Sequence, residues 1–264
     1  MGYRSLVRSF EWIACAYFGY IAVACWLPRL STARRAFLIA ASAAAGGAVV
    51  GVARSEVAWV RDIAPMAYIL VGYFLSGYLF VTPSLSTEAW LIRWDRRLLG
   101  DPATRFVTWP RLLVAALELI YMGCFLLIPA GAGLLAFTGH RSLIDRYWAM
   151  VVGAEFVAFA PLAFIQTRPP WVLERKPQLA DKTIHRLATQ MVEHVSIGVN
   201  TFPSGHAAGS LAVAFGVIGA VPWAGVVLLG LALGICVACV VGRYHYLIDV
   251  AAGAVVALVF WLVN

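Results

Sequence analysis

The stretch PWAGVVLLGLALGICVACVV, residues 222–241, decides the fold, because it is apolar throughout and carries no charge. A helix needs about 20 such residues to cross the hydrocarbon core of a bilayer. Comparable runs recur along the chain, and we expect spans at Phe10–Leu27, Ala36–Ala53, Ile63–Thr82, Leu112–Phe137, Tyr147–Gln166, His206–Ala220, Pro222–Val241 and Tyr246–Val263. The sequence therefore predicts an all-α integral membrane protein, a polytopic bundle of about eight transmembrane helices.

The composition of the whole chain agrees with this prediction. Hydrophobic residues make up 62% of the 264 residues and charged residues only 12%, whereas roughly 25% of a soluble domain is charged. This excludes a soluble globular protein. The first apolar run is longer than a signal-peptide core and no small-residue cleavage site closes it, so we interpret it as a retained helix. Because no long polar block or repeat interrupts the chain, we expect one membrane domain over residues 1–264.

Two segments between the apolar runs, residues 88–99 and 180–196, have amphipathic helical patterns. In the first, Trp90, Leu91 and Trp94 share one face of a helix, and Arg93 lies on another. Tryptophan is enriched at the level of the lipid headgroups, and arginine attracts anionic lipid. We therefore expect both segments to lie in the membrane interface.

The distribution of basic residues bears on partners. The formal net charge is +7, but the basic residues are dispersed at the ends of apolar runs instead of forming one stripe. This argues against nucleic acid and favours lipid headgroups as partners. The five cysteines all fall inside apolar runs, where an unpaired thiol behaves as a small hydrophobe, so no disulfide framework is expected.

Three polar segments stand where an apolar run meets a loop: Thr167–Pro170, Phe202–His206 and Gly242–Asp249. Two predicted spans separate the second segment from the third. An even number of crossings returns the chain to the same side of the membrane. We therefore expect all three segments to converge on one site.

The second segment has the pattern of an anion site at the start of a helix. Pro203 suits a first helical turn, and the amides that follow at Ser204 and Gly205 have no partner within the helix. Such N–H groups bind phosphate, and glycine permits its close approach. The imidazole of His206 can then donate a proton to a departing alkoxide.

The third segment contains a histidine and a carboxylate four residues apart. On a helix, His245 and Asp249 share a face, so the carboxylate can orient the imidazole and stabilise its cation. The other ring nitrogen is then available to attack phosphorus. Arg168 and Arg243 add two planar guanidinium groups of the kind that bind phosphate oxygens.

These residues resemble the pattern of the type 2 phosphatidic acid phosphatase (PAP2) superfamily: an Arg-Pro, then Pro-Ser-Gly-His, then an arginine followed by His-x-x-x-Asp. More narrowly, Gly242–Asp249 is similar to the branch of inositol phosphorylceramide and sphingomyelin synthases, which carry His-Tyr-x-x-Asp. The resemblance implies a six-helix core, here within residues 61–264, preceded by two accessory helices in residues 1–60. It also implies a metal-independent phosphohistidine mechanism without a cofactor.

Residue by residue, the resemblance implies that His245 is the nucleophile, that Asp249 orients it and that His206 is the general acid and base. The phosphate-binding groups that it implies are Arg168 and the amides of Ser204 and Gly205.

The chain departs from the family pattern at two positions. The usual lysine seven residues before the Arg-Pro is Pro161, for which Arg175, Lys176 or Lys182 are candidate substitutes. The usual arginine six residues before the nucleophile is Cys239. Arg243 would lie one turn beyond Cys239 on a continuing helix, so we expect it to supply the missing phosphate contact and expect its replacement by alanine to abolish turnover.

The primary hypothesis is a membrane-embedded lipid phosphatase that hydrolyses a phosphate monoester or diphosphate. One alternative is a phosphotransferase that moves a phospho-headgroup to an alcohol such as inositol, a sugar or a ceramide-like lipid. Another is a membrane protein that binds an anion without catalysis. A zinc hydrolase, with His206, His245 and Asp249 as ligands, is a further alternative.

Three more acids lie within or at the ends of apolar runs, where an ionisable group is a functional candidate. They are Asp62, Glu118 and Glu155, with structural pairing as the alternative interpretation.

We expect a multi-pass protein of a bacterial plasma membrane. Apart from Arg168 and Arg243, twelve basic residues fall on the catalytic side of the predicted bundle and six on the other. This bias favours a cytoplasmic active site, although relatives that act on the opposite face keep the orientation open.

Overall fold

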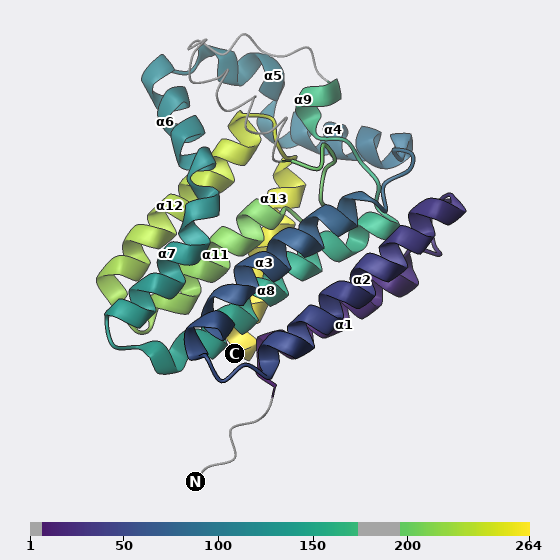
Figure 1. Ribbon diagram of the computed structural model, residues 1–264. Helices are drawn as coiled ribbons and strands as arrows, with labels where there is room; N and C mark the ends of the chain where they lie inside the picture. Colours follow the sequence, from purple (N-terminus) through teal and green to yellow (C-terminus); the bar gives the residue numbers. More distant parts are fainter. Residues whose placement is uncertain (1–6, 174–195) are drawn as a thin grey trace.

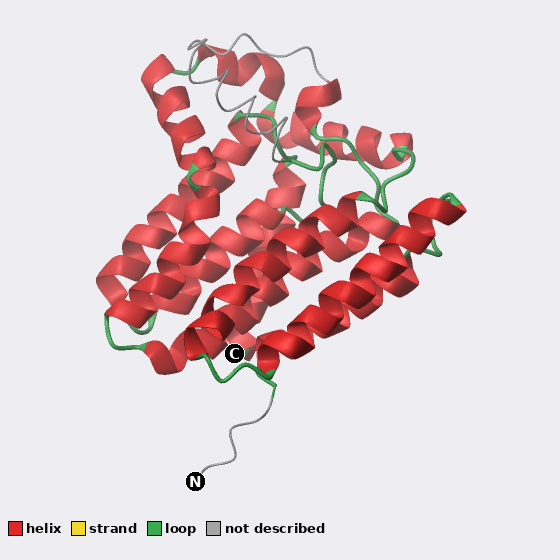
Figure 2. Ribbon diagram, in the orientation of Figure 1, coloured by secondary structure: helices red, strands yellow, loops and turns green. Residues whose placement is uncertain are grey.

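The computed structural model describes residues 7–173 and 196–264, and in these ranges the chain is helical apart from loops and one isolated β-bridge between Thr167 and Asn200 (Figures 1 and 2). The helices are α1 (Ser9–Ala24), α2 (Thr32–Ala53), α3 (Ala58–Gly77), α4 (Leu85–Leu99), α5 (Pro102–Arg105), α6 (Arg111–Met122), α7 (Cys124–Phe137), α8 (Ile144–Phe159), α9 (Pro170–Leu173), α11 (Gly205–Ile218), α12 (Pro222–Val241) and α13 (Leu247–Val263). Short 3₁₀ turns occupy Phe106–Thr108, Arg141–Leu143 and Ala160–Ala163. The prediction of an all-α fold is confirmed for these ranges.

Helices form in all eight of the predicted apolar segments, but their lengths differ. In the described ranges, α2, α3 and α12 are long and apolar enough to cross a bilayer, and α6 with α7 would form a fourth span bent by 57° at Gly123. The helices α1, α11 and α13 are apolar but shorter. The structure thus supports three or four spanning helices by length and composition, and the count of eight stays a prediction.

The outer surface of the bundle supports a membrane environment. Large apolar side chains point outward from several helices, including Leu112 at 86% exposure and Phe137 at 93%. Exposure of so many large apolar side chains is unusual for a soluble monomer. Several apolar helices together with this surface indicate a membrane protein.

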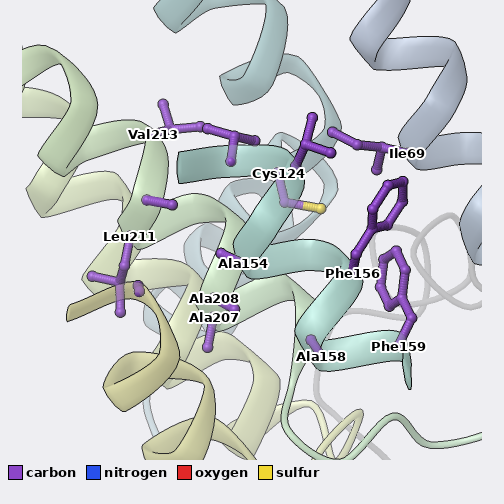
Figure 3. Close-up of a cluster of buried hydrophobic side chains, with 14 of the residues drawn as sticks. Ile69, Cys124, Ala154, Phe156, Ala158, Phe159, Ala207, Ala208, Leu211 and Val213 are labelled. Atoms are coloured by element: carbon purple, nitrogen blue, oxygen red, sulfur yellow. The ribbon is translucent and has the colours of Figure 1, made fainter. Parts of the chain in front are cut away.

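The core of the bundle lies around α8 and α11. Helix α8 is buried along nearly its whole length, and it contacts α1, α3, α11 and α13. Small residues on the two helices, among them Ala154 and Ala208, let the backbones approach closely, while Phe156 and Phe159 fill the space toward α3 (Figure 3). Close packing through small residues is how membrane helices associate without a hydrophobic driving force.

The two ends of the bundle differ in character. Helices α4, α5 and α9 gather at the end where α11 and α13 begin (Figure 1). At the opposite end, Asp62 forms ion pairs with Arg8 at 2.7 Å and with Arg141 at 2.6 Å. Structural pairing, the alternative interpretation of Asp62, is therefore what the structure shows.

The predicted helix at residues 88–99 is present as α4, which begins slightly earlier at Leu85 because Ser84 caps it. The side-chain oxygen of Ser84 accepts a hydrogen bond from the amide of Thr87 at 3.4 Å. The predicted helix at residues 180–196 falls almost entirely outside the described residues, as do Arg175, Lys176 and Lys182.

Candidate active site

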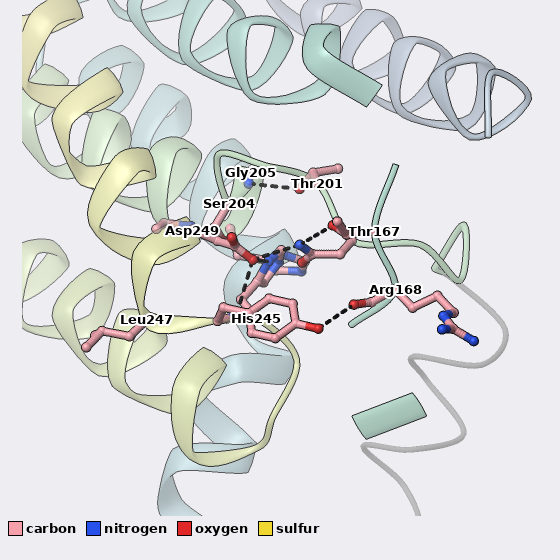
Figure 4. A network of polar contacts seen from close by, with 12 residues as sticks. Thr167, Arg168, Thr201, Ser204, Gly205, His245, Leu247 and Asp249 are labelled. Atoms are coloured by element: carbon pink, nitrogen blue, oxygen red, sulfur yellow. Dashed lines mark hydrogen bonds and ion pairs between the residues drawn. The ribbon is translucent and has the colours of Figure 1, made fainter. Parts of the chain in front are cut away.

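The three polar segments lie together in the structure (Figure 4). Thr167 and Asn200 form the isolated β-bridge, and the side-chain amide of Asn200 donates to the hydroxyl of Thr167 at 3.1 Å and to Asp249 at 2.8 Å. The hydroxyl of Tyr246 donates to the carbonyl oxygen of Arg168 at 3.1 Å. Hydrogen bonds therefore join segments that are far apart in the sequence.

The start of α11 is fixed by the segment around Ser204. The Ser204 hydroxyl accepts a hydrogen bond from the amide of Ala207 at 3.4 Å, so it caps the helix. The Ser204 amide donates to the carbonyl oxygen of Asp249 at 3.0 Å, and the Gly205 amide donates to Thr201 Oγ1 at 3.4 Å. Both predicted phosphate-binding amides are thus engaged within the protein, and that of Ser204 serves to hold α11 against α13.

Close contact between α11 and α13 depends on Gly253. A Cβ atom at this position would lie 2.5 Å from the Ser204 carbonyl oxygen and 3.2 Å from the Ala208 amide nitrogen. Both neighbours are backbone atoms, which cannot turn aside. Glycine at this position therefore lets the histidine at the start of α11 approach the one just before α13.

The two histidines face each other directly. His245 Nε2 lies 3.3 Å from His206 Nδ1, and the ring centroids are 5.4 Å apart. The other nitrogen of His206, Nε2, lies 3.3 Å from the hydroxyl of Tyr121, whose ring stacks on the imidazole. The expectation that these two imidazoles meet is satisfied by the geometry.

Asp249 lies on the far side of His245. Its Oδ2 atom is 3.5 Å from His245 Nδ1, an ion-pair distance that is too long for a hydrogen bond. The same oxygen accepts hydrogen bonds from the side chain of Asn200 and from the backbone amide of Tyr246, the latter at 3.2 Å. With a proton on Nδ1 toward the carboxylate, His245 presents the lone pair of Nε2 toward His206.

Burial favours the neutral form of the nucleophile candidate. His245 is only 5% exposed, and burial lowers its pKa to about 3. A neutral imidazole has the lone pair that an attack on phosphorus requires.

Arg168 does not reach the histidines. Its backbone amide, Nε and Nη2 all donate to the carboxylate of Glu88 on α4, at 2.8, 2.9 and 2.8 Å. Burial by itself would raise the pKa of Glu88, but these contacts with Arg168 outweigh it, so the pKa is lowered. Figure 4 shows the Arg168 guanidinium directed away from His245.

The expected position of Arg243 is wrong. Helix α12 ends at Val241, and Arg243 follows its cap in a left-handed conformation with φ of 60°, so the helix does not continue from Cys239 through Arg243. The Arg243 side chain is 1% exposed and donates to Asp95 on α4 at 2.9 Å. The Arg243 side chain therefore lies between α4 and the loop that carries His245.

Four groups at this site were not among the predicted site residues: Glu88, Asp95, Asn200 and Thr201. The two acids lie on the amphipathic α4, where the sequence pattern favoured a membrane surface and gave no sign of inward pairing. Asn200 and Thr201 directly precede the Phe-Pro-Ser-Gly-His segment. Their polar side chains beside that motif are the feature of the sequence that could have identified them as site residues.

A cavity of about 210 Å³ begins beside the histidines and extends into the bundle. His206, His245 and Gly205 line one part of it, and the rest is lined mainly by apolar side chains of α3, α7 and α8. Neither Arg168 nor Arg243 lines this cavity. The arrangement combines two adjacent imidazoles with space for an apolar chain.

The zinc alternative requires three protein ligands around one ion. Among residues 7–173 and 196–264, no three histidine, cysteine, aspartate or glutamate side chains are grouped closely enough to hold one.

Comparison with known proteins bears on what such a site does. A family model of the PAP2 superfamily matches residues 89–263, which include His206, His245, Asp249 and most of α4. No curated protein and no solved structure gives a significant match. Membership of this superfamily is consistent with a phosphatase or phosphotransferase of lipid phosphates. On this match, which covers more than half of the sequence, the chain belongs to the PAP2 superfamily.

Proposed function

We propose that the protein is a membrane-embedded lipid phosphatase that hydrolyses a lipid phosphate monoester or diphosphate through a phosphohistidine intermediate. The observation that carries this proposal is the 3.3 Å approach of His245 Nε2 to His206 Nδ1 at the end of an apolar cavity. One ring can attack phosphorus while the other handles the proton, and the cavity takes the apolar part of the substrate.

In the first step, the lone pair on His245 Nε2 attacks phosphorus and the bond to the ester oxygen breaks. Protonated His206 gives its Nδ1 proton to the departing alkoxide. Asp249, beside Nδ1 of His245 at 3.5 Å, stabilises the cationic phosphohistidine. Because the imidazoles are within 3.3 Å of each other, they must separate to admit the phosphoryl group.

In the second step, neutral His206 accepts a proton from a water molecule whose oxygen attacks phosphorus. The phosphorus–nitrogen bond breaks, phosphate leaves, and His245 regains its lone pair. The Tyr121 hydroxyl can accept a hydrogen bond from His206 Nε2–H in both states, so Nδ1 is the nitrogen that gives and takes the proton.

Arg168 is the phosphate-binding arginine in this proposal. In the structure this side chain is held on Glu88 and points away from His245, so it must turn toward the histidines to bind the phosphate. It is 34% exposed, so an incoming phosphate can compete with Glu88 for the guanidinium. Arg243, buried against Asp95, acts instead by holding the His245 loop in place. The amides at the start of α11 provide further positive electrostatic potential.

Phosphotransfer is the second candidate, favoured by the similarity of Gly242–Asp249 to inositol phosphorylceramide and sphingomyelin synthases. An alcohol hydroxyl would then replace water in the second step. All roles of the histidines would stay the same.

The test is an assay of the purified full chain with labelled lipid phosphates, with and without inositol, a sugar or ceramide. Release of free phosphate supports the phosphatase, and a new labelled phosphate ester of the added alcohol supports the transferase. Activity should persist with a chelator and be blocked by vanadate. Absence of any product from folded protein would contradict both activities and leave the non-catalytic alternative.

A further inference from the structure

The cavity contains one carboxyl group that the steps above do not use. Glu155 of α8 lines the cavity and is 7% exposed. In the two described ranges, no side chain or backbone group forms a hydrogen bond or ion pair with it. Burying a carboxyl group without a polar partner is costly, so this group requires an explanation.

Other buried acids make the contrast clear. Glu11 accepts hydrogen bonds from Arg61, Glu88 from Arg168, and Asp249 from Asn200. Each has a partner within the protein that offsets the cost of burial. Glu155 differs from them in facing a cavity, where a ligand can supply the partner.

Helix α11 is shaped to accommodate the Glu155 carboxyl group. Gly205 and Gly209 lie one turn apart on the side that faces α8. A Cβ atom at Gly209 would overlap Glu155 Oε1, and one at Gly205 would lie 2.9 Å from Oε2. The carboxyl group therefore sits against the residue that immediately precedes His206.

The surroundings restrict what the partner can be. The cavity that Glu155 lines has mainly apolar walls, with Ile69, Leu70 and Phe125 among the lining residues. A carboxylate accepts hydrogen bonds only, and a protonated carboxyl group still keeps an acceptor oxygen. The complementary ligand is an apolar chain that carries a hydrogen-bond donor close to its phosphate.

We infer that Glu155 selects lipid phosphates whose backbone carries a free hydroxyl or amide N–H. Monoacylglycerol and sphingoid backbones carry such a donor, whereas diacylglycerol and polyprenyl backbones do not. The inference rests on the proposed function, because it assumes that a lipid phosphate binds between the histidines with its chain in the cavity. Glu155 is a specificity residue in this account and takes no part in the proton transfers.

The experiment compares two probes that differ by one donor: 1-acylglycerol 3-phosphate, which has a free 2-hydroxyl, and its 2-O-methyl ether. The ratio of their kcat/KM values is measured for purified full-length protein in mixed micelles. Wild type should prefer the hydroxyl lipid by about tenfold or more, because loss of the donor leaves a buried acceptor unsatisfied. Glu155→Leu should lose this preference by turning over the hydroxyl lipid more slowly.

Two further variants separate selection from general damage. Glu155→Gln keeps an acceptor oxygen and the side-chain shape, so it should retain part of the preference even if the leucine variant unfolds. Glu118→Gln changes a buried acid on α6 that does not line the cavity, and it should leave the ratio unchanged. Thermal unfolding in detergent checks that each variant is folded.

The outcomes distinguish this inference from the proposed function. Equal turnover of both lipids by wild type, or equal losses on both in the Glu155 variants, would overturn the selection while leaving the phosphatase in place. No turnover of either lipid by folded wild type would overturn the proposed function and the selection together.

Discussion

The polar side chains at the two ends of the bundle have different surroundings. At the end with Asp62 and Arg8, buried acids and arginines neutralise one another in short ion pairs. At the other end, His206 and His245 face each other at 3.3 Å, and Glu155 faces a cavity. At the end with Asp62, which we call the paired end, the ion pairs stabilise the fold. The other end also has ion pairs, of Arg168 with Glu88 and of Arg243 with Asp95, but it has in addition groups that face a cavity, where a ligand can complete the structure.

The largest expected effect lies in the nucleophile. His245→Ala should lower turnover of a lipid phosphate by about a thousandfold or more, because it removes the nitrogen that forms the covalent intermediate. The matched control is His140→Ala, which removes a histidine near the paired end and should leave the rate unchanged. Comparable rates for the two variants would show that the ends do not differ as described.

A substitution at the paired end should lower the stability of the protein and leave its catalytic rate unchanged. Glu11 is fully buried and accepts two hydrogen bonds from Arg61, at 2.7 and 2.9 Å. Glu11→Gln should destabilise the protein by about 3 kcal/mol, since a guanidinium loses its counter-ion. Unfolding in detergent measures this loss, and kcat at a temperature where the variant stays folded should match wild type. A lower kcat in the folded variant would contradict the assignment of a purely structural role to this end of the bundle.

A smaller effect is expected at Tyr121. Tyr121→Phe removes the hydroxyl that lies 3.3 Å from His206 Nε2 but keeps the stacked ring. We expect kcat to fall by about tenfold with little change in KM, in line with the loss of one hydrogen bond. Tyr17→Phe is the control, because that hydroxyl donates to the carbonyl of Gly72 away from the cavity. Equal effects of the two substitutions on kcat would rule out the assigned role.

The smallest effect concerns pH. The pKa of His245 is about 3 in the folded protein and 6.5 as an ordinary histidine, so between these values the unfolded chain binds a proton that the folded protein does not. Its contribution to stability therefore decreases as the pH falls from 6.5 toward 3. His245→Asn should unfold with a weaker pH dependence in that window. An unchanged dependence would indicate that His245 is not buried in the neutral form.

Much of the fold follows from hydrophobic periodicity alone. All eight apolar segments form helices, because a predominantly apolar run in a membrane must satisfy its backbone hydrogen bonds within the protein, and a helix does so within one segment. The break at Gly123 is not predictable in this way, since the run from Leu112 to Phe137 is apolar on both sides of it, with Glu118 as its one charged residue, and hydropathy does not reveal a bend of 57°.

The candidate site was predictable to a lesser degree. The motifs identified His206, His245 and Asp249, and the even number of predicted crossings placed them on one side. The partners of the arginines could not be predicted, because Glu88 and Asp95 come from α4, and ion pairs between distant segments depend on tertiary packing. The predicted position of Arg243 is wrong for a local reason, because α12 ends at Val241 and does not continue through Arg243.

The central claim is that the two imidazoles act together on one phosphate ester. The direct measurement is to mix the protein with ³²P-labelled lipid phosphate, quench within the first turnover, and locate the label by mass spectrometry under conditions that preserve phosphohistidine. The account predicts a phosphoryl group on His245 in wild type and none in His245→Ala. Turnover without label on His245, or label on another residue, would contradict it.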